Sequence, residues 1–342
     1  MAESLTVDSP VLAPAVAPII LRGRTGEPVI IDPPLALAPM AGVSDRPFRQ
    51  LCREYGAGLV VTEMMSAKPE LQSSAKSRLR QIDSNDIEPR AVQLLGNEPD
   101  ELAEAARFAV AQGAQLIDLN LGCPAKKVCK KAAGSALMAE PDTVARLLEA
   151  LVAAVDCPVS MKMRTGPDRE WRNAVQIAKI AENAGISMLS IHGRTRADRY
   201  EGEAEYDTIA EVVAAVDLPV FANGDITTPQ KAREVITHTG ASGIMVGRGA
   251  FGQPWIFSAL KAELTGQPLP DAPDRAERFA VVKKQFEKIY EHYGDSLGIR
   301  IARKHLGWYA AALALGEEDR AEFNRFEHPE QQRRWLAQHA NG

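Results

Sequence analysis

Eight short apolar runs, each ending in polar residues or glycine, constrain the fold of this 342-residue chain more than any other feature. They are Leu35 to Met40, Leu59 to Met64, Arg90 to Leu95, Leu116 to Leu121, Val159 to Arg164, Met188 to His192, Val220 to Asn223 and Gly243 to Val246. Helical periodicity fills the segments between them, as in Arg46 to Tyr55, Pro99 to Ala111 and Trp171 to Asn183. Eight strand-helix units within about 230 residues predict a (β/α)8 barrel. A doubly wound sheet is the alternative, but it usually carries its phosphate loop after the first strand, whereas the best candidate loop here follows the eighth.

The flanking segments complete the predicted organisation. Ile19 to Arg22 and Val29 to Ile31 are spaced for a small hairpin that closes the bottom of the barrel. Beyond a linker at Gly266 to Pro273, one buried helical face is predicted from Phe279, Val282, Phe286, Ile289 and Tyr290. We therefore predict a flexible tail over residues 1–18, a barrel over 19–262 and a helical domain over 263–342.

Composition excludes several classes of protein. No apolar run reaches the roughly 18 residues that a membrane span needs. Pro10, Pro14 and Pro18 interrupt the apolar start, and acidic residues stand where a signal peptide carries positive charge, so we expect a cytoplasmic protein. The four cysteines form no C-x-x-C pair, which predicts neither a metal site nor a disulfide framework. The net charge of −5 argues against a nucleic-acid partner unless the basic residues gather on one face.

Polar side chains stand near the ends of several predicted strands, where barrel enzymes carry their chemistry. Gln93 lies in an apolar run, and Lys162 lies between two methionines. Burying such groups costs several kcal/mol unless they are paired. Lys162 alone would fit a structural ion pair, and His192 alone an interior histidine. Because Gln93, Lys162 and His192 all stand at the same end of the predicted barrel, together they favour a functional site there.

The last two strand ends predict a phosphate site. Asn223-Gly224-Asp225 follows the seventh strand and Gly247-Arg248-Gly249 the eighth, the two loops that commonly bind phosphate in this fold. The second loop also fits G-x-G-x-x-G, but its position after the eighth strand does not suit a dinucleotide fold.

The fourth strand ends in Asn120-Leu121-Gly122-Cys123-Pro124. A cysteine in such a loop could act as an acid or a nucleophile, although a half-buried spectator thiol is the more common case. Lysines follow it at Lys126, Lys127, Lys130 and Lys131, either as a solvated face or as contacts for phosphates.

These motifs together resemble the tRNA-dihydrouridine synthases. The resemblance is carried by Pro39-Met40-Ala41-Gly42-Val43-Ser44-Asp45, Gln93-Leu94-Leu95-Gly96, Asn120 to Pro124, Lys162-Met163-Arg164, Ile191-His192-Gly193-Arg194-Thr195, Asn223-Gly224-Asp225-Ile226 and Gly247-Arg248-Gly249. They occur in the family's order from about Leu35 to Trp255, and Cys123 to Val128 is most similar to the bacterial B-type subgroup.

The resemblance implies FMN at the barrel mouth. Pro39, Met40 and Ala41 would lie against the isoalloxazine ring, Gln93 and Lys162 would bond its polar edge, and His192 would lie nearby. The ribityl phosphate would be bound by Asn223, Gly224, Asp225, Gly247 and Arg248. A lysine at the pyrimidine end of the flavin would stabilise the negative charge of the reduced ring.

The resemblance also implies the reaction. NADPH would reduce FMN, a hydride would pass from the flavin to C6 of a uridine in tRNA, and Cys123 would protonate C5. The other residues expected at the substrate are Asn120, Lys126, Lys127 and Arg194, with Arg300, Arg303 and Lys304 on one face of the helical domain. We expect a monomer that extrudes the target base into its pocket.

Two departures and two rivals accompany this interpretation. Cys129 stands six residues after Cys123, where the family is expected to have Asn or Thr, and the Pro- and Ala-rich start is longer than the family needs. One rival is an RNA-binding or chaperone-like protein that keeps flavin only as structure. The nearer rival is an FMN barrel that reduces a small pyrimidine, because its flavin site would be much the same. The helical domain and the lysine-rich loop favour tRNA.

Overall fold

The computed structural model describes residues 15–72, 75–83, 86–129 and 133–340. Its parallel sheet has the order β4-β3-β11-β10-β9-β8-β7-β6-β5. These strands are β3 (Leu35–Leu37), β4 (Leu59–Val60), β5 (Met65–Ser66), β6 (Ala91–Leu95), β7 (Leu116–Leu121), β8 (Val159–Arg164), β9 (Met188–His192), β10 (Val220–Asn223) and β11 (Gly243–Val246). The predicted (β/α)8 barrel is confirmed.

The predicted second strand, Leu59 to Met64, is a regular strand only at β4, and β5 begins directly after its predicted end. Between them, Val61 forms a parallel bridge with Ala91, and Thr62 N donates to Ala91 O over 3.0 Å, which closes the ring between β4 and β6. The hydroxyl of Thr62 then accepts from Gln93 N at 3.0 Å. A side chain thus replaces a backbone acceptor here, and the regular ladder is interrupted.

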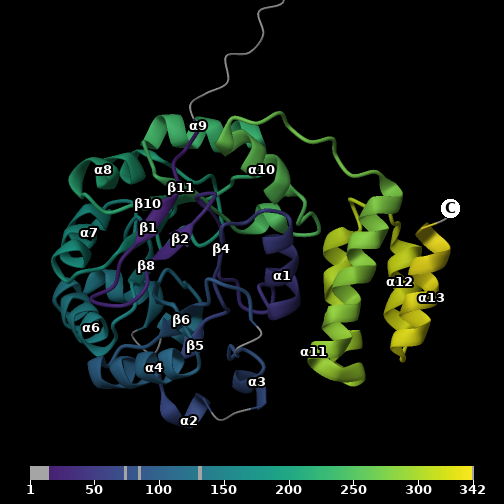
Figure 1. The fold of residues 1–342 in the computed structure, drawn as a ribbon, viewed down its shortest axis with the longest axis horizontal. Helices are drawn as coiled ribbons and strands as arrows, with labels where there is room; N and C mark the ends of the chain where they lie inside the picture. Colours follow the sequence, from purple (N-terminus) through teal and green to yellow (C-terminus); the bar gives the residue numbers. More distant parts are fainter. Residues whose placement is uncertain (1–14, 73–74, 84–85, 130–132, 341–342) are drawn as a thin grey trace, which may run out of the picture.

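Helices surround the strands (Figure 1). They are α1 (Arg46–Glu54), α2 (Pro69–Gln72), α3 (Ala75–Arg78), α4 (Pro99–Ala111), α5 (Lys126–Cys129), α6 (Pro141–Ala154), α7 (Ala174–Asn183), α8 (Asp207–Ala215), α9 (Pro229–Thr239) and α10 (Ile256–Thr265), with 3-10 turns η1 (Gly134–Ala139) and η2 (Arg248–Ala250). Apolar helix faces pack on the strands, as with Leu147 and Leu151 of α6, both fully buried. The predicted helix at 171–183 starts three residues later, because Trp171 N instead donates to Asp168 Oδ1 at 2.9 Å in a turn.

The predicted hairpin is present as β1 (Ile19–Leu21) and β2 (Val29–Ile31), paired antiparallel. The side chains of Leu21 and Ile31 are buried against residues at the starts of the barrel strands, among them Phe221. The hairpin therefore covers the end of the barrel opposite the polar strand ends (Figure 1). In consequence, the open mouth lies at the carboxyl ends of the strands.

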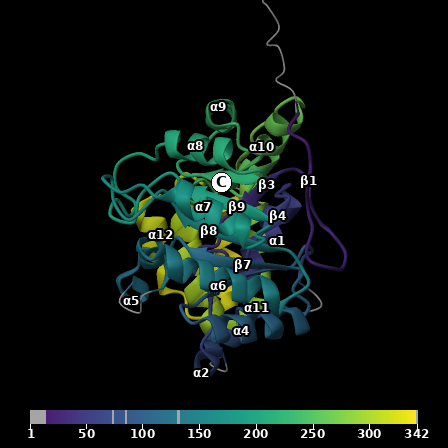
Figure 2. The ribbon, with the colours of Figure 1, turned by 90° about the vertical axis from the view of Figure 1, so that its left-hand side faces the viewer.

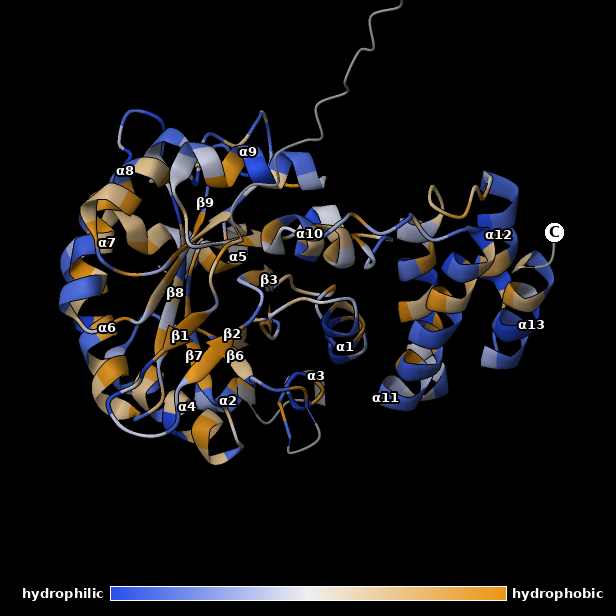
Figure 3. Ribbon diagram, turned by 45° about the horizontal axis from the view of Figure 1, so that its top comes forward, coloured by the Kyte–Doolittle hydropathy of each residue, from blue (hydrophilic) through white to orange (hydrophobic). Residues whose placement is uncertain are grey.

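The helical domain consists of α11 (Arg275–Tyr309), α12 (Glu317–Arg325) and α13 (Pro329–Ala340). All five residues predicted for its buried face lie in its apolar core, which Phe323 and Trp335 complete. Figure 2 shows this domain behind the barrel, and Figure 3 shows α11 beside α1. The predicted boundary at residues 262–263 falls within α10, whose Phe257 and Leu260 pack in the barrel core, and a non-helical stretch follows α10.

Two classes of feature are absent from the described part of the chain. No described helix is long and apolar enough to cross a bilayer. The described residues also include no cluster of three or more His, Cys, Asp and Glu side chains arranged to hold a metal ion.

Candidate functional site

Strand register brings the predicted polar residues together near the carboxyl ends of neighbouring strands. Asn120 of β7 pairs with Lys162 of β8, and His192 of β9 pairs with Asn223 of β10. Side chains alternate between the two faces of a strand, so residues two apart point to the same side. Gln93 and the Asp118 beneath Asn120 are also register partners. These registers show which of the predicted residues are neighbours, while their roles as site residues stay predictions.

A chain of amide groups runs along β6 and β7. Asp118 accepts from Gln93 Nε2 and from Ser160 Oγ, both at 2.7 Å, and the oxygen of Gln93 accepts from Asn120 Nδ2 at 2.7 Å. Asn120 Oδ1 then accepts from the backbone N–H of Cys123 at 2.9 Å. The carboxylate can only accept unless it is protonated, so it fixes the orientation of both amides and, through them, the Cys123 loop. Burial raises the pKa of Asp118.

Lys162 lies between this chain and the arginines of the next strands. Its ammonium donates to Asn223 Oδ1 at 3.0 Å, and Asn223 Nδ2 donates to Met245 O at 2.8 Å. Burial, assisted by the charge of Arg164, lowers the pKa of Lys162 to about 8. The lysine therefore carries most of a charge at neutral pH, yet gives it up more readily than an exposed lysine.

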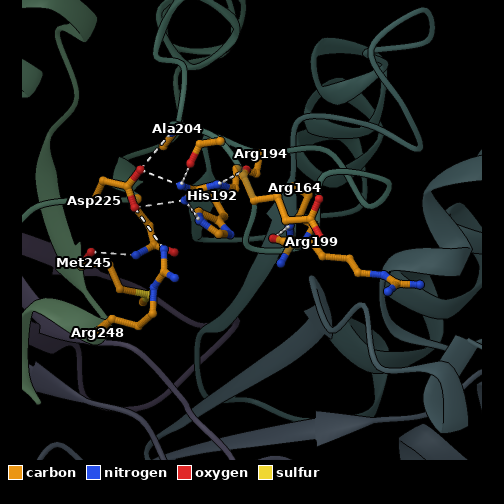
Figure 4. Close-up of polar contacts among 12 residues, drawn as sticks. Arg164, His192, Arg194, Arg199, Ala204, Asp225, Met245 and Arg248 are labelled. Carbon is orange, nitrogen blue, oxygen red and sulfur yellow. Dashed lines mark hydrogen bonds and ion pairs between the residues drawn. The ribbon is translucent and has the colours of Figure 1, made fainter.

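An arginine cluster occupies the mouth beside β9 to β11 (Figure 4). Arg194 is buried and forms two bonds to Asp225, at 2.9 and 2.7 Å, while Arg248 Nη2 reaches the same carboxylate at 3.1 Å. Arg194 Nη1 lies 3.3 Å from His192 Nε2. Burial and the surrounding cations, Lys162 foremost, hold the pKa of His192 well below its usual range, so its ring is neutral.

Glycine at position 224 permits this cluster. Gly224 has a φ of 128°, and a Cβ there would lie 2.6 Å from the Cβ of Ala204 and 3.1 Å from the ring of His192. Asp225 follows in the left-handed region with φ of 47°, and its carboxylate also accepts from Ala204 N at 2.9 Å. A larger residue at 224 would displace the chain that presents Asp225.

Two further residues of the mouth were missed by the sequence analysis. Arg164 is buried and donates to Gly122 O at 2.8 Å and to Arg199 O at 2.7 Å, so it connects two rim loops. Tyr200 is 56% exposed, with the guanidinium carbons of Arg164 and Arg248 each 5.4 Å from its ring centroid. The alternation of β8 directs Arg164 to the same face as Lys162, two residues earlier, so its signal was present in the sequence. Tyr200 lies in an irregular loop, which has no such period.

Cys123 is partly buried, and burial raises the pKa of its thiol. Its carbonyl accepts from Ser135 Oγ at 2.9 Å and lies 3.7 Å from Cys129 Sγ. Cys129 therefore lies in the same loop as Cys123, next to the Cys123 carbonyl. Of the lysines predicted nearby, the side chains of Lys126 and Lys127 and the whole of Lys130 and Lys131 lie outside the described residues.

The remaining predicted residues divide between two places. Pro39, Met40 and Ala41 form the turn after β3, and a Cβ on Gly247 would lie 3.6 Å from the sulfur of Met40, which places Met40 at the mouth. In the helical domain, Arg300 is exposed, whereas Arg303 Nη2 donates to Phe326 O at 2.6 Å and Lys304 Nζ to Gly42 O at 2.6 Å. The predicted basic face of α11 thus has two of its three cations in contacts within the chain.

The chain is similar to a known family of proteins along most of its length. A family model described as dihydrouridine synthase matches residues 36–341. The chain is 55% identical over 306 residues to "tRNA-dihydrouridine synthase B" of Pseudomonas syringae pv. tomato, which covers 89% of this chain and 90% of that protein. It is 50% identical to the protein of the same name from Vibrio vulnificus, over 85% of this chain and 90% of that one.

Solved structures show the same barrel at low sequence identity. Histamine dehydrogenase from Rhizobium sp. 4-9 superposes with a TM-score of 0.54 at 11% identity, over 81% of this chain and 51% of that one. A complex of 2-naphthoyl-CoA reductase also gives 0.54 at 11% identity, over 75% and 53%. At this identity, the likeness concerns the fold alone.

Proposed function

We propose, from the premise that this chain belongs to the dihydrouridine synthase family, that it is an FMN-dependent enzyme that reduces a uridine of tRNA to 5,6-dihydrouridine with NADPH. The observation that carries the proposal is the 55% identity, over nearly nine tenths of the chain, to a protein named tRNA-dihydrouridine synthase B. The polar mouth supports it, since its groups suit both a flavin and a uracil.

The donors around the mouth fit a flavin phosphate. Lys162, Arg164, Arg194 and Arg248 bring four cationic groups to the region, against the two carboxylates of Asp118 and Asp225. This surplus is what an anionic phosphate needs, and the same cations, together with burial, lower the pKa of His192. Asn223, Gly224, Asp225, Gly247 and Arg248 would hold the phosphate, with Asp225 acting through its backbone N–H because its carboxylate would repel the anion. Gly247 leaves open the space beside Met40 that a Cβ would enter.

The amide chain fits the ring of the flavin. Gln93 uses one N–H and one lone pair in its bonds to Asp118 and Asn120, so one donor and one acceptor position have no partner among the described residues and could meet a heteroaromatic edge. Lys162 would supply a positive charge beside that edge. Pro39, Met40 and Ala41 would cover one face of the ring, with His192 nearby. FMN bound there would supply the hydride for C6 of the uracil.

Cys123 would deliver the proton to C5 of the uracil. A thiol whose pKa is raised by burial keeps its proton at neutral pH, as an acid must. Asn120 holds the backbone of Cys123 by accepting its N–H, and a base presented to Cys123 would lie near the Asn120 amide. Arg194 would stay in its pair with Asp225 and keep the rim loop in place for the substrate.

The substrate would be a base extruded from folded tRNA, because a stacked base does not reach a barrel mouth. Arg300 on α11, together with Lys126 and Lys127 of the Cys123 loop, would contact the phosphate backbone. Lys304 and Arg303 would contribute less than predicted, because both already donate to backbone oxygens of the chain. Shape rather than sequence would guide the docking.

The test combines spectroscopy with product mapping. The purified protein should show flavin absorption bands and, with NADPH and unmodified tRNA, should form dihydrouridine that mass spectrometry locates at a defined position. Cys123→Ala should bind flavin and oxidise NADPH but form little product. Cys129→Ala is the matched control, since it removes the other thiol of the same loop, and it should keep product formation near that of the wild type.

Two outcomes would contradict the proposal. A protein that binds FMN and oxidises NADPH but leaves tRNA unchanged, while reducing free pyrimidines, would be an oxidoreductase of small molecules. Equal product from Cys123→Ala and the wild type would remove Cys123 from the role of acid.

A further inference from the structure

The turn between β3 and α1, residues 39–45, is held by several hydrogen bonds. Met40 N donates to Ser44 Oγ at 2.7 Å, and Ser44 N donates back to Met40 O at 3.0 Å. Gly42 has φ of 76°, a value that favours glycine, and its N–H donates to the buried carboxylate of Glu63. These contacts come from the turn itself and from Glu63, and they leave Gly42 O and the side chain of Asp45 for other partners.

Helix α11 of the helical domain supplies those partners. Lys304 Nζ donates to Gly42 O at 2.6 Å, and the hydroxyl of Tyr293 donates to Asp45 Oδ2 at 3.0 Å. Asp45 is the N-cap of α1, where its other oxygen accepts from Phe48 N at 3.0 Å. One carboxylate therefore joins the end of the turn, the start of α1 and the helical domain, and it is only 4% exposed.

A buried histidine adds a third group from α11. Gln285 Nε2 lies 2.8 Å from His305 Nδ1, and the oxygen of Gln285 accepts from Tyr309 OH at 2.5 Å, so the amide donates to Nδ1 and leaves the hydrogen on Nε2. That Nε2 lies 3.9 Å from Asp45 Oδ2 and has no hydrogen-bond partner among the described residues. Burial lowers the pKa of His305 to about 3, so the ring is neutral.

Both halves of α11 reach the turn. The helix is broken at Gly294, whose φ of 69° and ψ of 175° are not helical. Tyr293 directly precedes this break, whereas Lys304 lies ten residues beyond it. A rotation of the first half of α11 would displace the turn through the Tyr293–Asp45 bond, and a rotation of the second half would displace it through the Lys304–Gly42 bond.

We propose that α11 sets the conformation of the turn that faces the flavin, and that Tyr293 and Lys304 are positioning residues for flavin binding. The inference rests on the proposed function, because Pro39, Met40 and Ala41 of this turn are the residues expected against the isoalloxazine ring. It follows that RNA bound to the helical domain and a flavin bound in the barrel act on one shared structural element.

The experiment titrates FMN into flavin-free protein and compares four variants. Tyr293→Phe and Lys304→Met each remove one hydrogen bond to the turn and should raise the Kd for FMN about fivefold. Lys304→Arg keeps a donor and should restore most of the affinity. Lys288→Met is the matched control: Lys288 donates to Gln50 Oε1 at 2.9 Å, in the same interface but on the middle of α1, and its loss should change the Kd by less than about 1.5-fold.

A second measurement separates positioning from plain stability. In the flavin-free protein, Tyr293→Phe should speed hydrogen exchange in peptides covering residues 39–45 and alter the visible circular dichroism of added flavin, whereas Lys288→Met should do neither. A different outcome is a wild type that binds FMN while Tyr293→Phe and Lys304→Met change neither the FMN affinity nor the hydrogen exchange of residues 39–45. That outcome would overturn this inference and leave the proposed function standing. Wild type that binds no FMN would overturn the proposed function and this inference with it.

Discussion

Buried polar groups are paired by different interactions on the two sides of the barrel mouth. On the amide side, Gln93, Asp118 and Asn120 of β6 and β7 are joined by hydrogen bonds that run in one direction from a single carboxylate. On the arginine side, Arg194 and Arg248 share the carboxylate of Asp225 as ion pairs. The first arrangement depends on which atoms donate and accept, whereas the second depends on charge. An aspartate should therefore tolerate replacement by asparagine on the amide side but not on the arginine side.

The largest effect is expected from Asp225→Asn. Arg194 is only 2% exposed, and an amide removes the charge that balances its guanidinium while filling nearly the same space. Breaking a fully buried pair costs about 3 kcal/mol or more, but the carboxylate of Asp225 is 31% exposed and partly screened, so we expect a loss of about 2 to 3 kcal/mol. Urea denaturation of the flavin-free proteins measures this loss in the free energy of unfolding. Asp156→Asn is a suitable control, since its pair with Arg24 is exposed and should contribute less than about 1 kcal/mol.

Asp118 should behave differently on the amide side. Asp118→Leu leaves the buried donors of Gln93 and Ser160 without acceptors, which costs about 2 kcal/mol in total or more. Asp118→Asn can still accept from Gln93 and can donate to Ser160 Oγ, so it should lose less than about 1 kcal/mol by the same measurement. Equal losses for Asp118→Asn and Asp225→Asn would show that the two sides do not differ as described.

The same contrast explains how much the sequence could predict. The barrel was predictable because its parallel strands are buried on both faces and therefore appear in the sequence as short, nearly continuous apolar runs. The residues at the ends of those runs indicated the rim. Asp118 was missed although it stands two residues before Asn120, a spacing that directs both side chains to one face. The sequence therefore contained the information needed: the residue two positions before Asn120 on the same strand is polar and faces the same side.

Contacts between distant segments were not predictable in this way. Lys304 was expected to meet RNA because it shares a helical face with Arg300, but it donates to Gly42 O, 262 positions earlier in the chain. Charge and periodicity report which face of a helix is polar, not which neighbour that face meets. The place of Tyr200 was equally inaccessible, since an irregular loop has no period from which a side-chain direction follows.

Lys162 stands at the boundary between the two sides and should make stability depend on pH. Its pKa is about 8 in the folded protein, below the ordinary 10.5, so the unfolded chain binds more protons between these values. Stability attributable to Lys162 should therefore rise as pH increases from about 8 towards 10, by roughly 1 to 2 kcal/mol. The measurement is the difference in unfolding free energy between flavin-free wild type and Lys162→Met at pH 7.5, 8.5 and 9.5. A difference that stays constant or falls with pH would contradict the lowered pKa.

Tyr200 gives the smallest expected effect, because it touches the arginine side only from outside. The guanidinium carbons of Arg164 and Arg248 each lie 5.4 Å from its ring centroid, and the ring is 56% exposed. Exposed cation–π contacts contribute about 0.5 kcal/mol each, so Tyr200→Leu should lose less than about 1 kcal/mol in urea denaturation. Tyr200→Phe keeps the ring and should match the wild type. A loss in Tyr200→Phe equal to that in Tyr200→Leu would assign the effect to the hydroxyl. In that case a hydrogen bond from Tyr200 would stabilise the outer edge of the arginine side, and this edge would resemble the amide side, which is joined by hydrogen bonds.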